Sequence, residues 1–298
     1  MSIIEISEQA FMPVTVGTEF IMNSEAVIRL SFFFGTLAVM SVMEFMFPRR
    51  TLITSKPVRW LGNLGVVLIS TATLRLIFPL LAVDLSLIAQ QKHWGLFNNY
   101  NMPGWLEVIS GVIILDLVIY LQHLMFHTVP VLWRLHMMHH TDLDIDLSTG
   151  VRFHPIEIYL SMGIKMAAVA VFGTSPLSVL IFEVVLNSTA MFNHSNFRLP
   201  LGFDRVLRLL VVTPDMHRVH HSVTIRETNS NFGFNFPWWD RLLGTYRAQP
   251  AAGHEGMTIG LSQFRDPKRL SLPWMLALPF IGDPGNYAIN RRGKDPLK

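Results

Sequence analysis

The sequence predicts an all-α integral membrane protein, with about four transmembrane helices, the last two a hairpin, capped by a cytosolic His-rich helical domain. Half of the 298 residues are apolar and only 15% are charged, whereas a typical soluble domain carries about 25% charged residues. The mean hydropathy is positive, at +0.37, and the apolar residues gather in long stretches. Most of the 12 histidines lie between His123 and His221. The length suits a single membrane-bound domain over residues 1–298.

Four apolar stretches are long enough to span a bilayer, which takes roughly 20 residues of helix. They cover residues 26–47, 60–83, 105–129 and 156–192. The first three predict one transmembrane helix each, within residues 26–129. The fourth contains Gly-Thr-Ser-Pro at 173–176, a turn signal that would split it into an antiparallel hairpin. A shorter run at 271–281 has two prolines and predicts an interfacial anchor or a re-entrant segment.

The basic residues predict the orientation in the membrane. The loop 48–59 holds Arg49, Arg50, Lys56 and Arg59, whereas residues 1–25 contain no Lys or Arg. The positive-inside rule therefore places this loop in the cytoplasm and the N-terminus outside. Counting onward, residues 130–155 and 193–270 form the cytosolic cap, and the C-terminus is cytoplasmic. Because the start of the chain lacks basic residues, we expect no cleavable signal peptide.

Charged residues interrupt the apolar stretches at Arg29, Glu44, Arg75, Asp116, Lys165 and Glu183. Most are interpreted as lying near helix ends, where long side chains reach the headgroups. Asp116 differs, because it lies seven residues before His123 on the same helical face. It is either a hydrogen-bond partner of a metal-ligating histidine or a polar residue turned into the bundle.

Histidines recur in three motifs that predict a metal site. His123 and His127 form H-x3-H, which places both on one face of a helix. Two copies of H-x2-H-H follow, made of His136, His139 and His140 and of His217, His220 and His221. The chain has no cysteine, which excludes disulfides, thiolate metal sites and cysteine nucleophiles. A transition metal must therefore be held by nitrogen and oxygen ligands.

The number of histidines favours two metal ions. The motifs supply eight imidazoles, His194 is a plausible ninth, and a structural zinc ion takes only about four ligands. Two ions, each with four or five imidazoles and an open position, fit better. Iron, zinc and copper all suit imidazole ligands. A carboxylate-bridged di-iron bundle is disfavoured, because its Glu-x-x-His repeats are missing.

Carboxylates near the histidines are candidate outer partners, since a ligand histidine usually donates its second N–H to a carboxylate or carbonyl. The candidates are Asp116, Asp142, Asp144, Asp146, Glu157, Asp215 and Asp240. Asp215 follows Pro214 and can equally begin a helix. The stretch 229–240 is rich in Phe, Trp, Asn and Gly, and predicts a loop packed over the metal site or lying at the membrane surface.

The amino-acid sequence around the motifs resembles that of the fatty-acid hydroxylase and sterol desaturase superfamily, in its bacterial branch. The resemblance covers roughly residues 116–247. It is carried by RFHPIE at 152–157, NHSNFRLP at 193–200, TPDMHRVHHS at 213–222 and ETNSNFGFNFPWWDRLLGTYR at 227–247. It implies a non-haem di-iron centre held by the eight motif histidines, with His194 as a further ligand. His154, within the HPxE segment, is implied as an outer partner.

The resemblance implies an O2-dependent enzyme that hydroxylates an unactivated C–H bond of a membrane lipid, with a fatty acyl, sterol-like or amino-lipid substrate. A desaturase on the same scaffold stays open, and a histidine-rich metal-binding or transport protein is a third interpretation. The sequence lacks a Gly-rich dinucleotide motif and a haem-binding domain, so we expect a separate electron-donor protein. Zinc would be a substitute ion, because it has no redox chemistry. Without a long Lys/Arg run, no nucleic acid is expected. The resemblance of the motifs to the bacterial branch of the family implies a bacterial inner membrane as the location.

Overall fold

The computed structural model describes residues 24–289, and all regular secondary structure within this range is helical. Only two isolated bridges, Pro48 with Phe197 and Ser222 with Ile259, have strand-like pairing in the described range. The N-terminal segment that the sequence places outside the membrane lies almost entirely outside the described residues.

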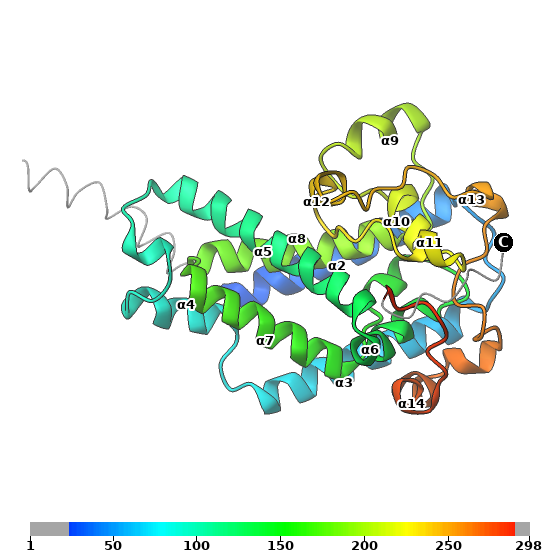
Figure 1. Ribbon diagram of the computed structural model, residues 1–298, viewed down its shortest axis with the longest axis horizontal. Coiled ribbons are helices and arrows are strands. Elements are labelled where there is room, and N and C mark those ends of the chain that lie inside the picture. The colour runs from blue at the N-terminus through cyan, green and yellow to red at the C-terminus, as the bar shows by residue number, and fades with distance from the viewer. Residues whose placement is uncertain (1–23, 290–298) are drawn as a thin grey trace, which may run out of the picture.

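Five helical segments are long and apolar enough to cross a membrane, which is consistent with the predicted integral membrane protein. They run side by side along the long axis of the molecule (Figure 1). The helices are α2 Glu25–Met46, α3 Lys56–Ile77 with its continuation α4 Ala82–Gln91, α5 Gly104–Thr128, α7 Pro155–Phe172 and α8 Pro176–His194. The sequence predicted about four such helices, and how many of the five cross a bilayer stays a prediction.

The break between α7 and α8 falls at the predicted turn. Gly173 ends α7 with φ of 68°, a left-handed conformation that glycine adopts without steric cost. Pro176 is the first residue of α8, and the Ser175 hydroxyl accepts a hydrogen bond from the backbone N–H of Ser178. The two helices make few contacts with each other, because α7 packs mainly on α3, α4 and α5, whereas α8 packs mainly on α2, α5 and the segment 147–151. They therefore diverge from their turn, and this leaves room inside the bundle.

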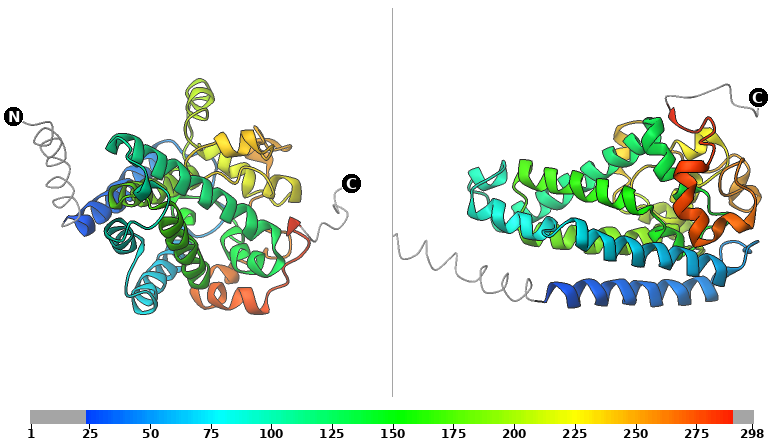
Figure 2. Two further views of the ribbon diagram at one scale, coloured as in Figure 1. Left: turned by 60° about the vertical axis from the view of Figure 1, so that its left-hand side comes forward. Right: turned by 90° about the horizontal axis from the view of Figure 1, so that it is seen from below.

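Shorter helices form a cap at one end of the bundle (Figure 1). They are α6 Pro130–His140, η2 Leu147–Val151, α9 Leu201–Leu207, α10 Pro214–His220, α11 Ile225–Thr228, α12 Trp238–Leu242, α13 Gly253–Gly256, η3 Pro267–Leu270 and α14 Leu272–Ile281. Helix α14 is the segment predicted as an interfacial anchor. It packs on α3 and α6 (Figure 2), and Arg134 on α6 donates to the Pro279 carbonyl at 2.7 Å.

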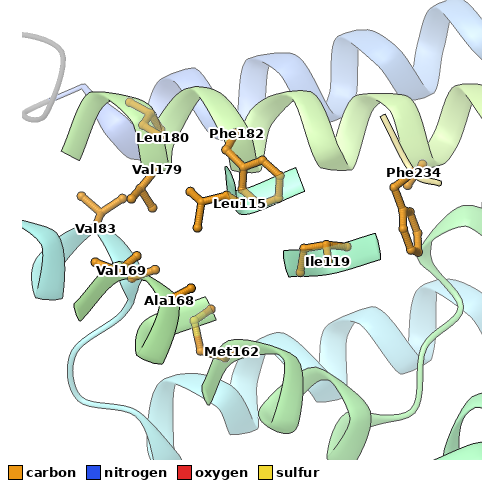
Figure 3. Packing of buried hydrophobic residues seen from close by; sticks show 12 residues of the cluster. Val83, Leu115, Ile119, Met162, Ala168, Val169, Val179, Leu180, Phe182 and Phe234 are labelled. Atoms are coloured by element: carbon orange, nitrogen blue, oxygen red, sulfur yellow. The ribbon is translucent and has the colours of Figure 1, made fainter. Parts of the chain in front are cut away.

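A hydrophobic cluster extends along the bundle from the end remote from the cap to Phe234 near the cap (Figure 3). Leu115 of α5 lies among Val179 and Phe182 of α8, and Ile119 lies one turn closer to the cap. The outward faces are apolar as well: Phe45 of α2, for example, is 87% exposed. A surface of this kind is favourable in hydrocarbon and costly in water, as expected for helices that face lipid.

Buried ion pairs join the bundle to the cap. Arg59 of α3 is fully buried and bonds both carboxylate oxygens of Asp142, at 2.7 and 2.9 Å, and Asp146 at 2.7 Å. Arg152 is also fully buried and bonds the Asn63 side chain at 2.9 Å. Gly150 of η2 lies so close to the Ala190 carbonyl of α8 that a Cβ would sit 2.3 Å from its oxygen. These contacts fix the loop that follows His140, the last histidine of the first H-x2-H-H motif.

Candidate metal centre

Nine buried histidines converge where the bundle meets the cap, and they separate into two groups. The first is the five-histidine group, made of His123, His127, His136, His140 and His220. The second is the four-histidine group, made of His139, His194, His217 and His221. Within each group, one nitrogen of every ring lies within 4.8 Å of the others. These nine are the eight motif histidines and His194.

Helix geometry explains the division, because residues four apart share a face whereas adjacent residues do not. On α6, His136 and His140 point into the five-histidine group and His139 into the other. In the second H-x2-H-H motif the assignment is reversed. His217 and His221 point into the four-histidine group, and His220 points into the five-histidine group. Each copy therefore gives a helical pair to one site and its middle histidine to the other, so the two sites lie side by side.

The outer nitrogen of six of these rings is held by an acceptor. Nδ1 of His123 lies 2.7 Å from the Phe232 carbonyl, and Nδ1 of His220 lies 2.7 Å from the Ser230 carbonyl. The same atom contacts acceptors in His127 (Asn229), His136 (Glu157), His139 (Arg152 carbonyl) and His194 (Ala190 carbonyl). A carbonyl or carboxylate oxygen accepts but cannot donate, so the proton of the neutral ring is on Nδ1. Nε2 then presents a lone pair to the interior of its group.

Inside the groups these lone pairs face one another. Nε2 of His123 and His136 are 3.1 Å apart, and Nε2 of His194 and His217 are 3.0 Å apart. Burial lowers the pKa of His136 and His217 well below the usual value, so these imidazoles are neutral at physiological pH. Nε2 of His220 is buried and has no hydrogen-bond partner among the described residues. Converging, unprotonated ring nitrogens fit cations and would repel one another without them.

Glu157 is the one predicted carboxylate that bonds a histidine of the groups directly. Its Oε1 lies 2.6 Å from Nδ1 of His136, and both side chains are buried. A carboxylate in this position fixes the ring orientation and makes the inward nitrogen more basic. Asp240 acts one step further out, because it accepts the backbone N–H groups of Phe232 and Gly233 at 2.8 and 2.9 Å. It thereby holds the loop whose carbonyls bond His123 and His220.

The other predicted outer partners make different contacts. Asp116 turns into the bundle and accepts the Trp239 indole N–H at 2.8 Å. Asp144 bonds backbone N–H groups of the loop 48–59, Asp215 pairs with Arg49 and Arg218, and Asp142 and Asp146 pair with Arg59. His154 caps α7, and its Nε2 bonds the Leu276 carbonyl at 3.2 Å. None of these side chains bonds a histidine of either group within residues 24–289.

Several partners of the histidines were not predicted from the sequence. The Asn229 side chain bonds His127 at 3.1 Å, and the Arg152 carbonyl bonds His139 at 3.2 Å. The Phe153 ring stacks on His139, with centroids 4.4 Å apart and an interplanar angle of 12°. Asn229 begins the stretch 229–240 that was predicted to pack over the site, and this stretch does pack there through Phe232. Backbone carbonyls leave no composition signal, because every residue has one.

A cavity of about 420 Å³ begins at the five-histidine group and extends into the bundle. His123 and His136 line one end, next to Phe153 and Phe234, and its walls are contributed by α2, α3, α5, α7 and α8. The volume lies in the usual range for small-molecule sites, roughly 300–1,000 Å³. The cavity is therefore large enough for one hydrocarbon chain that reaches the histidines.

Fold and site together define a helical, apolar-surfaced protein with a buried polyhistidine centre at one end of an internal cavity. The fatty acid hydroxylase family model matches residues 108–245, a range that contains every histidine of both groups. This match, together with the relatives below, supports the fatty acid hydroxylase and sterol desaturase superfamily for the region that holds the site.

Known relatives share the matched region. The chain is 29% identical over 174 residues to an ornithine lipid hydroxylase of Rhizobium tropici, which covers 58% of this chain and 51% of that protein. It is 30% identical over 181 residues to human alkylglycerol monooxygenase, covering 59% of this chain and 39% of that protein. It is 29% identical over 147 residues to human cholesterol 25-hydroxylase, covering 47% and 51%. The matches thus span about half or less of these relatives. No solved structure gives a significant match.

Proposed function

We propose that this chain is an O2-dependent, non-haem di-iron oxidoreductase that hydroxylates an unactivated C–H bond of a membrane lipid. The observation that carries the proposal is the convergence of nine buried imidazoles in two adjacent groups, with unprotonated nitrogens facing inward. The relatives named as a hydroxylase of ornithine lipid, a monooxygenase of alkylglycerol and a hydroxylase of cholesterol support the reaction class.

Each group would hold one ion, with His123, His127, His136, His140 and His220 around the first and His139, His194, His217 and His221 around the second. Iron bound here would supply the redox chemistry that activates O2, which zinc cannot. The overall reaction consumes the C–H bond, O2, two electrons and two protons, and yields an alcohol and water. The electrons would come from a separate donor protein.

The protein's own contribution is orientation and the exclusion of water. Outer bonds from Glu157 and from the Phe232 and Ser230 carbonyls keep the rings in one tautomer and one orientation. Phe153 and Phe234 form apolar walls beside the rings, so a hydrocarbon segment can approach while bulk water is kept out. A substrate in the cavity meets the five-histidine group, because His123 and His136 line it.

The test uses the full chain purified from membranes in detergent, together with lipid extracts of the producing cells. We expect two irons per chain, and a lipid product that carries heavy oxygen when the cells are grown under labelled O2. His220→Ala and His139→Ala remove one imidazole from each group, and both should lose iron and product. His93→Asn is the matched control, because His93 is exposed, lies outside both groups and has φ of 54°, which asparagine tolerates.

The outcomes separate the alternatives. A product with a new double bond and no labelled oxygen would identify a desaturase on the same scaffold. A single, readily exchanged ion with no lipid-dependent O2 uptake would favour a metal-binding or transport protein. Persistence of the lipid product in His220→Ala and His139→Ala would refute the ligand assignment.

A further inference from the structure

The cavity that begins at the histidines ends at a group of charges inside the bundle. Lys165 of α7 forms an ion pair with Glu183 of α8, and Arg29 of α2 bonds the second oxygen of the same carboxylate at 2.5 Å. Lys165 and Glu183 are only 8% and 6% exposed. Lys165 and Glu183 lie in the middle of α7 and α8, and Arg29 lies in the second turn of α2; all three helices are apolar enough to span a membrane. Charged groups in such a place are expensive and usually functional.

All three charges line the cavity, and cations outnumber carboxylates at this end. The lining includes Arg29, Arg75 and Lys165, with Glu183 as the carboxylate at this end, since Glu157 lies at the histidine end. Outside the lining, Glu25 pairs with Arg29 at 2.7 Å, so three cations face two carboxylates. An ammonium group and a guanidinium group each have more N–H donors than Lys165 and Arg29 use in hydrogen bonds within residues 24–289. At the charged end of the cavity, Lys165 and Arg29 can therefore donate hydrogen bonds to a further acceptor, such as an anionic oxygen.

The distance from this end to the histidines follows from helix rise. Lys165 lies eight residues from Glu157 on α7, or about 12 Å, and Glu183 lies eleven residues from His194 on α8, or about 16 Å. Ile119 and Met162 supply apolar wall between the two ends. An extended hydrocarbon chain of roughly ten to twelve carbons covers such a span.

The cavity is reached from the side of the bundle. Phe32 on α2 and Thr71 and Arg75 on α3 line it and are also exposed. Helix α2 packs on α8 and helix α3 on α7, and α2 runs along one edge of the bundle (Figure 2). A lipid can therefore enter between α2 and α3 without passing through water.

We propose that Lys165 and Arg29 bind the anionic headgroup, a carboxylate or a phosphate, of a lipid whose single chain extends toward the histidines. Glu183 pairs with both cations, lowers their net charge and competes with the anionic headgroup for them. This assignment rests on the proposed function and deepens it: the headgroup lies toward the helix ends remote from the cap, and the oxidised carbon lies about ten to twelve carbons away from it. A purely structural ion bridge would tie α2, α7 and α8 together without any preference for anions.

The test measures binding rather than turnover. Purified full-length protein, with its iron content recorded, binds radiolabelled palmitate in detergent and is competed with unlabelled palmitate, hexadecyl phosphate or 1-hexadecanol. We expect the palmitate and hexadecyl phosphate to bind about tenfold or more tighter than the neutral alcohol. The ratio of carboxylate to phosphate affinity distinguishes a fatty acid from a phosphate-bearing lipid as the source of the anion.

Variants separate headgroup binding from a structural role. Lys165→Met should lose the preference for anions and keep its affinity for 1-hexadecanol, whereas Lys165→Arg should retain the preference. Glu183→Gln removes the competing carboxylate and should strengthen anion binding, the opposite of what loss of a structural bridge would give. Lys92→Met removes a charge from an exposed position outside the cavity lining and is the matched control.

Equal affinity of the wild-type protein for palmitate and 1-hexadecanol would overturn this inference, as would an unchanged preference in Lys165→Met. If Lys165→Met does not fold, the change in anion affinity of Glu183→Gln decides. Stronger binding of palmitate supports headgroup binding, and weaker binding overturns it. Failure of the proposed function looks different: it appears as missing iron or as product made by His220→Ala, and neither depends on the competition experiment.

Discussion

Replacing Arg59 by methionine should destabilise the junction between the helical bundle and the cap. Arg59 is fully buried and is bonded to Asp142 and Asp146, and Asp142 also accepts the Thr149 hydroxyl at 2.8 Å. Methionine keeps a long apolar stem but no charge. The change therefore leaves two carboxylates buried without their main cation.

The expected loss in the free energy of unfolding follows from the pKa of the Asp142 carboxyl. Burial alone would raise its pKa, but the charge and hydrogen bonds of Arg59 lower it to about 2. A fall from about 3.9 in the unfolded chain to about 2 contributes about 3 kcal/mol at neutral pH. This contribution is present above the unfolded pKa and is lost as the pH falls toward 2. Removing one member of a buried ion pair costs about 3–5 kcal/mol, so we expect Arg59→Met to lose that much.

The assay is the apparent unfolding midpoint in detergent, read at a fixed heating rate as the fraction that stays monodisperse. A loss of this size should lower the midpoint by about 10 °C or more. Arg198→Met is the control, because Arg198 is exposed and has no ion pair within residues 24–289. Adding Asp142→Asn to Arg59→Met should recover part of the loss, since one uncompensated charge disappears. A midpoint for Arg59→Met equal to that of Arg198→Met would refute the reasoning.

Three further changes test the site and its scaffold. Glu157→Gln should weaken iron retention against a chelator by about 10- to 100-fold while the unfolding midpoint stays near wild type, and unaltered retention would contradict a role in orienting the histidine. Asp240→Ala leaves two buried backbone N–H groups without an acceptor, so both iron content and the protease resistance of the loop 229–240 should fall. Gly150→Ala should cost about 1–3 kcal/mol in a thermal melt, because its Cβ would meet the Ala190 carbonyl, whereas Gly163→Ala, with open space around it, should be neutral or stabilising.

The position of a side chain along a helix does not reveal its partner, so the sequence left the partners of several residues open. Most charged residues of the apolar stretches were interpreted as lying near helix ends, whereas Lys165 and Glu183 lie in the middle of α7 and α8 and bond each other. The break between α7 and α8 falls at the turn that the sequence predicted, and the sequence could not show that a cavity opens between these helices and α2, α3 and α5. Asp116 shares a helical face with His123 and still bonds Trp239, since α12 folds back beside it.

Local chemistry along the chain determined the helices and the histidine pairs by itself. Apolar runs set the five long segments, Gly173 and Pro176 set a break, and four-residue spacing put His136 beside His140 on one face. Only the tertiary structure assigned His139 to a different group from its neighbour His140, and brought His194 into it. The reason is physical: spacing fixes directions around one helix, whereas the meeting of rings from α5, α6, α8 and α10 depends on how those helices pack.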